Sequence, residues 1–323
     1  MATASRPTPG RNVARSSNAT PVPNIMRQGL APWWYLLPSL VVMTVFIVYP
    51  GLSTAFLSLR DKTGVDWAWA RCVAGQPCWG LFENYRYALT SPVMLTSFAN
   101  NLAWMVIMVS GTVLLGLLIA TLADRVPYEP LAKAIIFMPM AISFVGAGVI
   151  WKFVYDYSSS GAQVGVANAI ITALGGQPVS FLTQPVINTL ALIVVGIWMW
   201  TGFSMTILAA ALKGVPAEIL EAARVDGATE IEIFAGIMVP MILPTITVVI
   251  TTMIINVLKI FDIVYVMTGG QYSTEVIATR MYTEQYSNFD AGRAAAIAVV
   301  LVVVIVPAIY INVRRFREQE AAR

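Results

Sequence analysis

The sequence has no histidine, only two cysteines and few charges, and each shortage excludes a class of function. Without histidine, neither Ser-His-Asp catalysis, nor histidine acid–base catalysis, nor a histidine-ligated metal centre is possible. Cys72 and Cys78 provide too few thiolates for a zinc or iron–sulfur site, so we expect no metal and no cofactor. The net charge of +3 is too small to indicate a nucleic-acid partner.

Charged residues make up only 11% of the chain, whereas soluble domains have about 25%. Hydrophobic residues make up 58%, and the mean hydropathy is +0.73. A soluble globule with this composition could not cover its apolar surface, so the composition indicates a membrane protein.

Uncharged runs predict where the chain crosses the bilayer, because a charge at the bilayer centre costs about 2.5–3.5 kcal/mol. Six such runs reach the roughly 18 apolar residues that a span needs. We therefore predict an all-α, polytopic membrane protein with about six transmembrane helices. The runs lie between Arg27 and Arg60, Arg86 and Asp124, Lys133 and Lys152, Asp156 and Lys213, Glu232 and Lys259, and Arg293 and Arg314.

The fourth run is the longest, with 56 uncharged residues, but turn-forming sequences divide it. Breaks at Ser158–Gly161 and Gly175–Pro178 leave Ala162–Leu174 too short to span, so we expect an interfacial or re-entrant helix there. The fourth span is placed at Val186–Leu212.

An even number of spans places both termini on one side. Of the 20 Lys and Arg residues, 12 lie on that side, although its segments are shorter than the opposite loops. The positive-inside rule therefore predicts that both termini are cytoplasmic. Residues 1–29 carry four Arg and no acid and are predicted to be a disordered basic tail, residues 30–315 the transmembrane domain, and residues 316–323 a cytoplasmic C-terminal tail.

Two local features accompany this topology. Cys72 and Cys78 fall in the first outer loop, where an oxidising compartment favours a disulfide; two free thiols are the alternative. Thr112, Gly116 and Ala120 form a small-residue stripe on the second span, which allows another helix to approach closely.

The cytoplasmic segment after the fourth span has the densest cluster of charge. Pro216 suits the first position of a short helix, and Asp226-Gly227 can close that helix. Thr229 and Glu232 have the spacing of a capping box that opens a second helix. The pattern predicts a helix–turn–helix at about 213–240, which read alone could be only a well-capped connector.

A longer sequence pattern distinguishes this segment from an ordinary connector. Glu221-Ala222-Ala223, then Gly227, Ile237 and Val239-Pro240, resembles the E-A-A…G…I-x-L-P signature of permease subunits of binding-protein-dependent ABC importers. Val239 in place of leucine is a conservative departure.

Other segments between about Trp34 and Arg315 resemble the carbohydrate branch of that family. Within this branch, the six-span layout and the Cys72–Cys78 loop most resemble the α-glucoside permeases. In place of the family's G-x-P, this chain has Gln271-Tyr272-Ser273, so that outer loop is expected to differ in shape. The segments that carry the resemblance are Trp33–Ser39, Phe82–Tyr85, Phe137–Pro139, Trp198 and Trp200, Phe261-Asp262 and Thr268–Gly270.

The resemblance implies a non-enzymatic subunit that forms half of a sugar pathway in a bacterial or archaeal cytoplasmic membrane. It implies a second homologous permease, two ATPase subunits and an extracytoplasmic sugar-binding protein as partners, beside membrane lipid. The chain has no G-x-x-x-x-G-K-[ST] loop, in agreement with ATP hydrolysis by a separate subunit. The residues expected to couple to the ATPase are Glu218, Glu221, Ala222, Ala223, Arg224, Asp226 and Gly227.

Two other classes of membrane protein compete with this interpretation. A secondary transporter would usually have ionisable groups within its spans, and all six predicted spans lie in charge-free runs. A purely structural scaffold would not explain the docking signature in the charged loop.

A neutral sugar requires aromatic stacking surfaces and a few amide or hydroxyl partners. Tryptophans near span ends can also be interface anchors, and intramembrane Asn or Ser can hold helices together, so each candidate has a structural alternative. The candidates are Asn100, Asn101, Trp104, Trp198, Trp200, Thr201, Ser204 and Asn256.

Overall fold

The structure is a computed structural model that describes residues 31–66, 82–124 and 126–321. All regular structure in these ranges is helical, which confirms the predicted all-α class. Cys72 and Cys78 lie outside the described residues, as does the N-terminal tail 1–29, so the disulfide and the disordered tail stay predictions.

The chain divides into two compact units, residues 1–51 and 52–323. In the first, the described residues form α1 (Ala31–Met43), the π-helical segment η2 (Thr44–Val48) and the beginning of α2 (Tyr49–Ser58). The stretch Trp33–Ser58 is long and apolar enough to cross a membrane, as the first uncharged run predicts.

The second unit is built around α10 (Ile187–Lys213), which packs most extensively against α6 (Val109–Ala123). Before α6 come α4 (Glu83–Thr90), α5 (Pro92–Ala103) and the π-helical η3 (Trp104–Met108). Thr112, Gly116 and Ala120 are all buried on α6, which confirms that the predicted small-residue stripe packs helices together.

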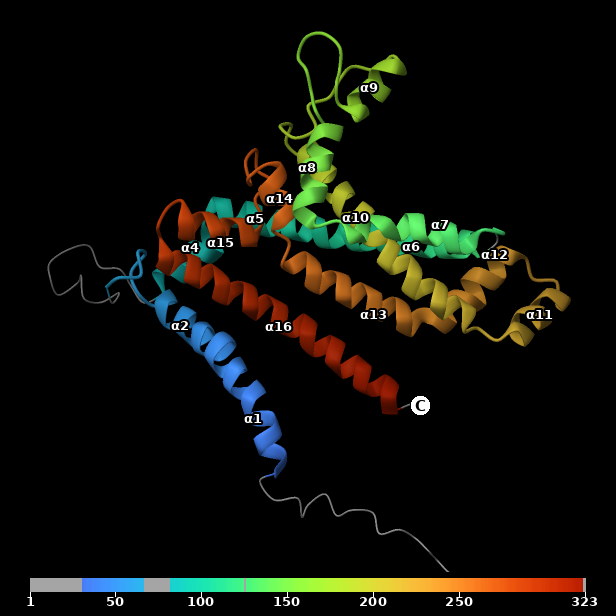
Figure 1. The fold of residues 1–323 in the computed structure, drawn as a ribbon, viewed down its shortest axis with the longest axis horizontal. Coiled ribbons are helices and arrows are strands. Elements are labelled where there is room, and N and C mark those ends of the chain that lie inside the picture. Colours follow the sequence, from blue (N-terminus) through green and yellow to red (C-terminus); the bar gives the residue numbers. More distant parts are fainter. Residues whose placement is uncertain (1–30, 67–81, 125, 322–323) are drawn as a thin grey trace, which may run out of the picture. The chain divides into compact units, whose positions relative to one another are not determined.

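The C-terminal helices of this unit pack against its earlier helices (Figure 1). α13 (Val239–Leu258) packs against both α10 and α16 (Ala291–Ala321), and α15 (Ile277–Tyr286) packs against α5 and α16. α16 continues to Ala321, past the boundary predicted at residue 315. Between α13 and α15 lies the short helix α14 (Asp262–Met267).

The buried amide of Asn84 anchors α4 to the end of α2. Its Nδ2 donates to the carbonyls of Ser58 at 3.0 Å and Arg60 at 2.8 Å, and the Tyr85 hydroxyl lies 2.6 Å from Ser58 Oγ. The Phe82–Tyr85 segment, which carries part of the family resemblance, therefore fastens the end of the first predicted span to the beginning of the second.

Four described helices are long and apolar enough to cross a membrane, and a bent pair raises the number to five. α10 confirms the fourth predicted span, and α9 (Val166–Ala173) is the expected short helix before it. The sixth predicted span lies in α16, whose apolar part Ala291–Pro307 is shorter than the others, so the count of six stays a prediction for this last helix.

The third predicted span is the bent pair. α7 (Glu129–Phe137) and the 3₁₀ segment η4 (Met138–Ala141) are followed by α8 (Phe144–Val154) at an angle of 100°. Pro139 lies inside η4, where its missing N–H and its ring prevent the helix from continuing. As a result α8 turns away from α6 and α10 and carries α9 with it (Figure 1).

Candidate functional site

The break in the third predicted span lies beside the middle of α10. Ile142 and Ser143 are extended, and Ser143 Oγ accepts a 3.0 Å hydrogen bond from Gly146 N to begin α8. Gly202 of α10 allows the close approach, because a Cβ there would lie only 2.6 Å from the carbonyl oxygen of Ile136. The break thus leaves two non-helical residues, Ile142 and Ser143, next to α10.

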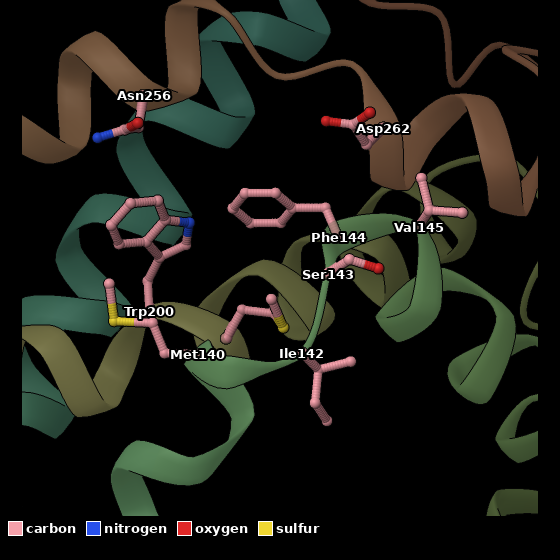
Figure 2. A pocket seen from close by; sticks show the side chains of 9 residues that line it. Met140, Ile142, Ser143, Phe144, Val145, Trp200, Asn256 and Asp262 are labelled. Carbon is pink, nitrogen blue, oxygen red and sulfur yellow. The ribbon is translucent and has the colours of Figure 1, made fainter.

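A cavity of about 450 Å³ opens at this break. Figure 2 shows the rings of Trp200 and Phe144 side by side, with Asn256 and Asp262 on the side formed by α13 and α14. The two rings are stacked, with centroids 6.0 Å apart and planes 29° from parallel. The full lining is Met140, Ile142, Ser143, Phe144, Val145, Met199, Trp200, Asn256 and Asp262.

A second cavity of about 240 Å³ adjoins the first and shares Phe144, Trp200, Asn256 and Asp262 with it. It adds the exposed Lys259 and the ring of Phe261. Together the cavities combine aromatic faces with an amide, a hydroxyl and one charge of each sign. This lining suits a ligand that has apolar faces and many hydrogen-bonding groups.

Two of the eight predicted substrate contacts, Trp200 and Asn256, meet in this lining. Asn256 Nδ2 donates to Thr252 O of its own helix at 2.9 Å, which fixes the orientation of the amide. Trp198 lies on another face of α10, where its ring meets that of Trp151 edge to face at 5.6 Å.

Three other candidates are buried in helix contacts. The side chain of Trp104 has no exposed surface, Thr201 Oγ1 donates to Ile197 O at 2.6 Å, and Ser204 faces the small-residue stripe of α6. In this conformation Trp104 and Ser204 pack between helices and Thr201 bonds within its own helix, so none of the three lines either cavity.

Asn100 and Asn101 bind backbone in the loop between α14 and α15. Asn100 Nδ2 donates to the carbonyls of Ser273 and Glu275, both at 2.7 Å, and Asn101 Oδ1 accepts from Ile277 N at 2.9 Å. From α10, Asn188 Nδ2 donates to Tyr272 O at 2.8 Å. These amides hold a loop in which Tyr272 and Ser273 have φ values of 56° and 63°.

Sequence reasoning missed most of the lining, including the polar residues Ser143, Lys259 and Asp262 and the aromatic ring of Phe144. Pro139 indicates a break, but the identity of the residues that face the cavity depends on the direction in which α8 leaves. Asp262 was visible only as part of the Phe261-Asp262 resemblance, and its place at the first position of α14 brings it to the cavity.

The predicted helix–turn–helix follows α10 at the end opposite α9 (Figure 1). It consists of α11 (Ala217–Val225) and α12 (Glu230–Ile233), with α12 continuing through the π-helical η5 (Phe234–Met238) into α13. Pro216 precedes α11 instead of opening it. Gly227 has φ of 85° in the turn, as expected for the residue that ends such a helix.

The second half of this segment is fixed by its own side chains. Thr229 and Glu232 form the predicted capping box, and the Glu232 side chain accepts from Thr229 N at 2.8 Å, which lowers the pKa of that carboxyl. Arg224 and Glu230 bridge the turn with a 2.8 Å ion pair, which raises the pKa of the guanidinium. The turn is therefore stabilised by side chains of its own segment.

Two large apolar side chains of this segment are exposed. None of the residues of α11 is buried, and the side chains of Val225 and Ile231 are 87% and 79% exposed. Glu221 is exposed on the same helix. Exposed apolar and charged groups beside such a turn are typical of a protein interface.

An ion-pair network joins this end of α10 to the beginning of α7. Lys213 reaches Glu129, and Lys133 binds Asp124 at 2.6 Å and Glu129 at 2.7 Å. The base of the helix–turn–helix is thus tied to the helix that leads into the break beside the cavity.

Comparisons with known proteins agree with this architecture. A family described as "binding-protein-dependent transport system inner membrane component" matches residues 112–317. The chain is 49% identical to an osmoprotective compounds uptake permease protein of Synechocystis sp., covering 90% of this chain and 100% of that one. It is 43% identical to an alpha-glucoside transport system permease protein of Rhizobium meliloti, covering 95% and 88%.

A solved structure shows the same fold. A chain of a bacterial ABC transporter involved in the import of the acidic polysaccharide alginate superposes with a TM-score of 0.69 at 23% identity, covering 88% of this chain and 95% of that one. The same kind of transporter, in complex with an alginate pentasaccharide-bound periplasmic protein, gives a TM-score of 0.71 at 21% identity, covering 87% and 92%. Together with its apolar helices and the family match, this identifies the chain as a membrane-embedded permease subunit of the binding-protein-dependent ABC importer family.

Proposed function

We propose that this permease carries a neutral sugar of the α-glucoside class through the two adjoining cavities at the break of the third span. The observation that carries the proposal is the stacked pair Trp200–Phe144 beside Asn256. A pyranose ring has apolar faces that pack on aromatic rings and hydroxyls that bond to amides and carboxylates. The relative that is 43% identical is named an alpha-glucoside transport permease, and one that is 30% identical is named for trehalose and maltose.

The partners follow from the same family. The chain would form half of the pathway, with a second homologous permease as the other half, two ATPase subunits on the cytoplasmic face and a sugar-binding protein outside. The transmembrane domain would extend from residue 30 to 315. Both termini would be cytoplasmic in a bacterial or archaeal cytoplasmic membrane, as the excess of Lys and Arg on that side indicates.

The coupling function belongs to the helix–turn–helix. Its exposed apolar residues Val225 and Ile231 and the exposed Glu221 support an ATPase contact at this turn. The network at Lys213 and Glu129 would pass a displacement of the turn to α7, and from there to the break. The residues in this role are Glu218, Glu221, Ala222, Ala223, Arg224, Asp226 and Gly227.

Co-purification and transport test the proposal together. The chain, tagged and expressed with its partner subunits, should retain the ATPase in detergent. After reconstitution in liposomes with the binding protein outside and ATP inside, the complex should accumulate radiolabelled maltose or trehalose. Loss of the ATPase on purification, or uptake driven by an ion gradient without ATP, would overturn the assignment.

A second substrate class deserves a parallel measurement, because the relative that is 49% identical is named for osmoprotective compounds. Some such compounds are small quaternary ammonium zwitterions, which also bind over aromatic rings such as Trp200 and Phe144. Glycine betaine in the same uptake assay distinguishes the two classes. Uptake of glycine betaine but of neither sugar would reassign the cavity to a quaternary ammonium zwitterion.

A further inference from the structure

Four aromatic rings form a continuous ladder between α14 and α15. Phe261 stacks on Tyr265 with centroids 5.0 Å apart and planes 16° from parallel. Tyr282 lies 5.3 Å from Phe261 and 4.9 Å from Tyr265, and Tyr286 lies 4.6 Å beyond Tyr282. We call this set the aromatic ladder.

Helical spacing and a fixed loop create this ladder. Phe261 and Tyr265 are four residues apart at the beginning of α14, and Tyr282 and Tyr286 are four residues apart at the end of α15, so each pair shares one helix face. The loop between the two helices is held by Asn100 and Asn188, whose amides donate to its backbone. The two faces are thereby brought together.

The ladder connects the substrate cavities to a third one. At one end, Phe261 lines the 240 Å³ cavity that contains Trp200 and Phe144. At the other end, Tyr282 and Tyr286 line a cavity of about 360 Å³ together with Gln285 and residues of α16. A ligand leaving the inner cavities along these rings would therefore stay in contact with aromatic surface.

The rings are accessible and carry polar groups. Tyr265 is 43% exposed and Tyr286 is 62% exposed. The pKa of the Tyr282 phenol is raised, first of all by its interaction with the Tyr265 hydroxyl. The exposed rings thus offer both apolar faces and hydroxyl groups.

We infer that the aromatic ladder is a carbohydrate-stacking track that guides the sugar between the 360 Å³ cavity and the cavities at the break. This inference rests on the proposed sugar transport. It assigns a substrate role to Tyr265, Tyr282 and Tyr286, outside the predicted contacts. Continuity with the Trp200 cavity favours a sugar over a helix of the partner permease, since the ladder begins inside a substrate cavity and carries a row of hydroxyls.

Replacing single rings by leucine separates a stacking role from simple apolar packing. Leucine keeps apolar volume for a helix or lipid contact but has no flat face for a pyranose. Tyr265→Leu and Tyr286→Leu should each raise the KM for maltotriose uptake about two- to tenfold in the reconstituted complex, as expected for aromatic contacts of about 0.5–1.5 kcal/mol at 1.4 kcal/mol per factor of ten. The KM for maltose should rise less, because the shorter sugar covers fewer rings.

Tyr128→Leu is the matched control, since Tyr128 is also 62% exposed but lies before α7, away from the ladder. It should leave both KM values unchanged. ATPase and partner permease recovery should be parental for all variants.

Three other results would each contradict the inference in a different way. Parental uptake of maltotriose with unchanged KM in both ladder variants overturns the track while leaving the proposed function intact. Loss of the partner permease from the purified Tyr265→Leu or Tyr286→Leu complex reassigns the rings to the permease interface. Failure of the parental complex to transport either sugar overturns the proposed function and with it the sugar as occupant of the ladder.

Discussion

Gly116 of α6 and Ser204 of α10 touch without any room for a side chain between them. A Cβ built on Gly116 would lie 2.5 Å from Ser204 Oγ and 2.9 Å from the backbone nitrogen of Met205. Since backbone cannot move aside as a flexible side chain can, glycine is the residue that fits at this crossing. The contact fixes the spacing of the two helices that form the centre of the fold.

Gly116→Val should therefore destabilise the protein. Overpacking a close helix contact costs about 1–3 kcal/mol, so the midpoint of thermal unfolding in detergent should fall clearly below that of the parent. Gly236→Ala is the control, because Gly236 also lies in a helical segment but has no atom within 4 Å of the added Cβ. Equal midpoints for Gly116→Val and the parent would mean that the helices can separate at no cost.

Features set by local sequence were predictable. Three predicted features depend on residues that are near one another in the chain, and the structure confirms each of them. They are the small-residue stripe at Gly116, the short helix before the fourth span and the capping box at Thr229. The break at Pro139 also has a local cause, since proline removes a backbone donor and its ring prevents the helix from continuing.

Features set by long-range contacts were not predictable. Nothing in the neighbourhood of Asn100 indicates that its amide will meet the carbonyl of Ser273, a contact across 173 positions. Phe144 joins Trp200 only because α8 leaves the break at 100°, and that angle depends on packing against α14. Amide and aromatic residues in apolar runs can therefore be identified from the sequence. Which of them contact other parts of the protein and which line the cavities cannot be predicted in this way.

A buried ion pair outside the spans makes a prediction about pH. Glu284 is fully buried and binds Arg280 of the same helix, while Arg280 Nη2 also donates to the Tyr87 hydroxyl at 2.7 Å. Burial alone would raise the pKa of Glu284, but hydrogen bonds from Tyr87 and Asn288 and the charge of Arg280 hold it below its ordinary value. The pair therefore contributes stability above the unfolded pKa of about 4.5, which is lost as the pH falls through the folded pKa.

Arg280→Gln should reverse that dependence. Glu284 would then be buried without a cation, its pKa would rise, and stability would be lost as the pH increases above about 4.5. At neutral pH the expected loss is about 3–5 kcal/mol, the usual cost of breaking a buried pair. Thermal midpoints between pH 4.5 and 8, taken as the difference from the parent, measure the effect.

The double variant Arg280→Gln/Glu284→Gln separates the charge from the packing. It should recover much of the stability at neutral pH and show no pH-dependent difference in this range, because no ionisable group remains at position 284. If Arg280→Gln alone gives a difference that is constant with pH, Glu284 is not the group that depends on Arg280.

Trp200→Ala should weaken transport more than assembly. The indole ring stacks on Phe144 and lines both cavities, so its removal should raise the KM for maltose about two- to tenfold, the range for a lost aromatic contact of about 0.5–1.5 kcal/mol. Trp198→Ala is the control, because that ring packs against Trp151 and lines neither cavity. A parental KM in a normally assembled Trp200→Ala complex would remove Trp200 from the substrate site.

The last prediction concerns the turn between α11 and α12. Gly227 has a positive φ and open space around it, so an Asp there would strain the backbone without a clash inside the chain. A displaced turn would no longer present Val225 and Ile231 in the same arrangement to a partner. Gly227→Asp should therefore insert normally but recover less ATPase on purification and transport little sugar, and Glu221→Ala should show the same defect if its exposed carboxylate binds the ATPase.

Gly175→Asp provides the matched control for backbone strain. Gly175 also has a positive φ, 83°, and no atom within 4 Å of an added Cβ, but it follows α9 at the other end of α10. The same substitution there should leave ATPase recovery unchanged, because the proposed contact is confined to the turn at Gly227. Parental ATPase recovery and uptake in both Gly227→Asp and Glu221→Ala would mean that the segment is only a connector, since an ATPase contact centred on this turn could not tolerate both changes.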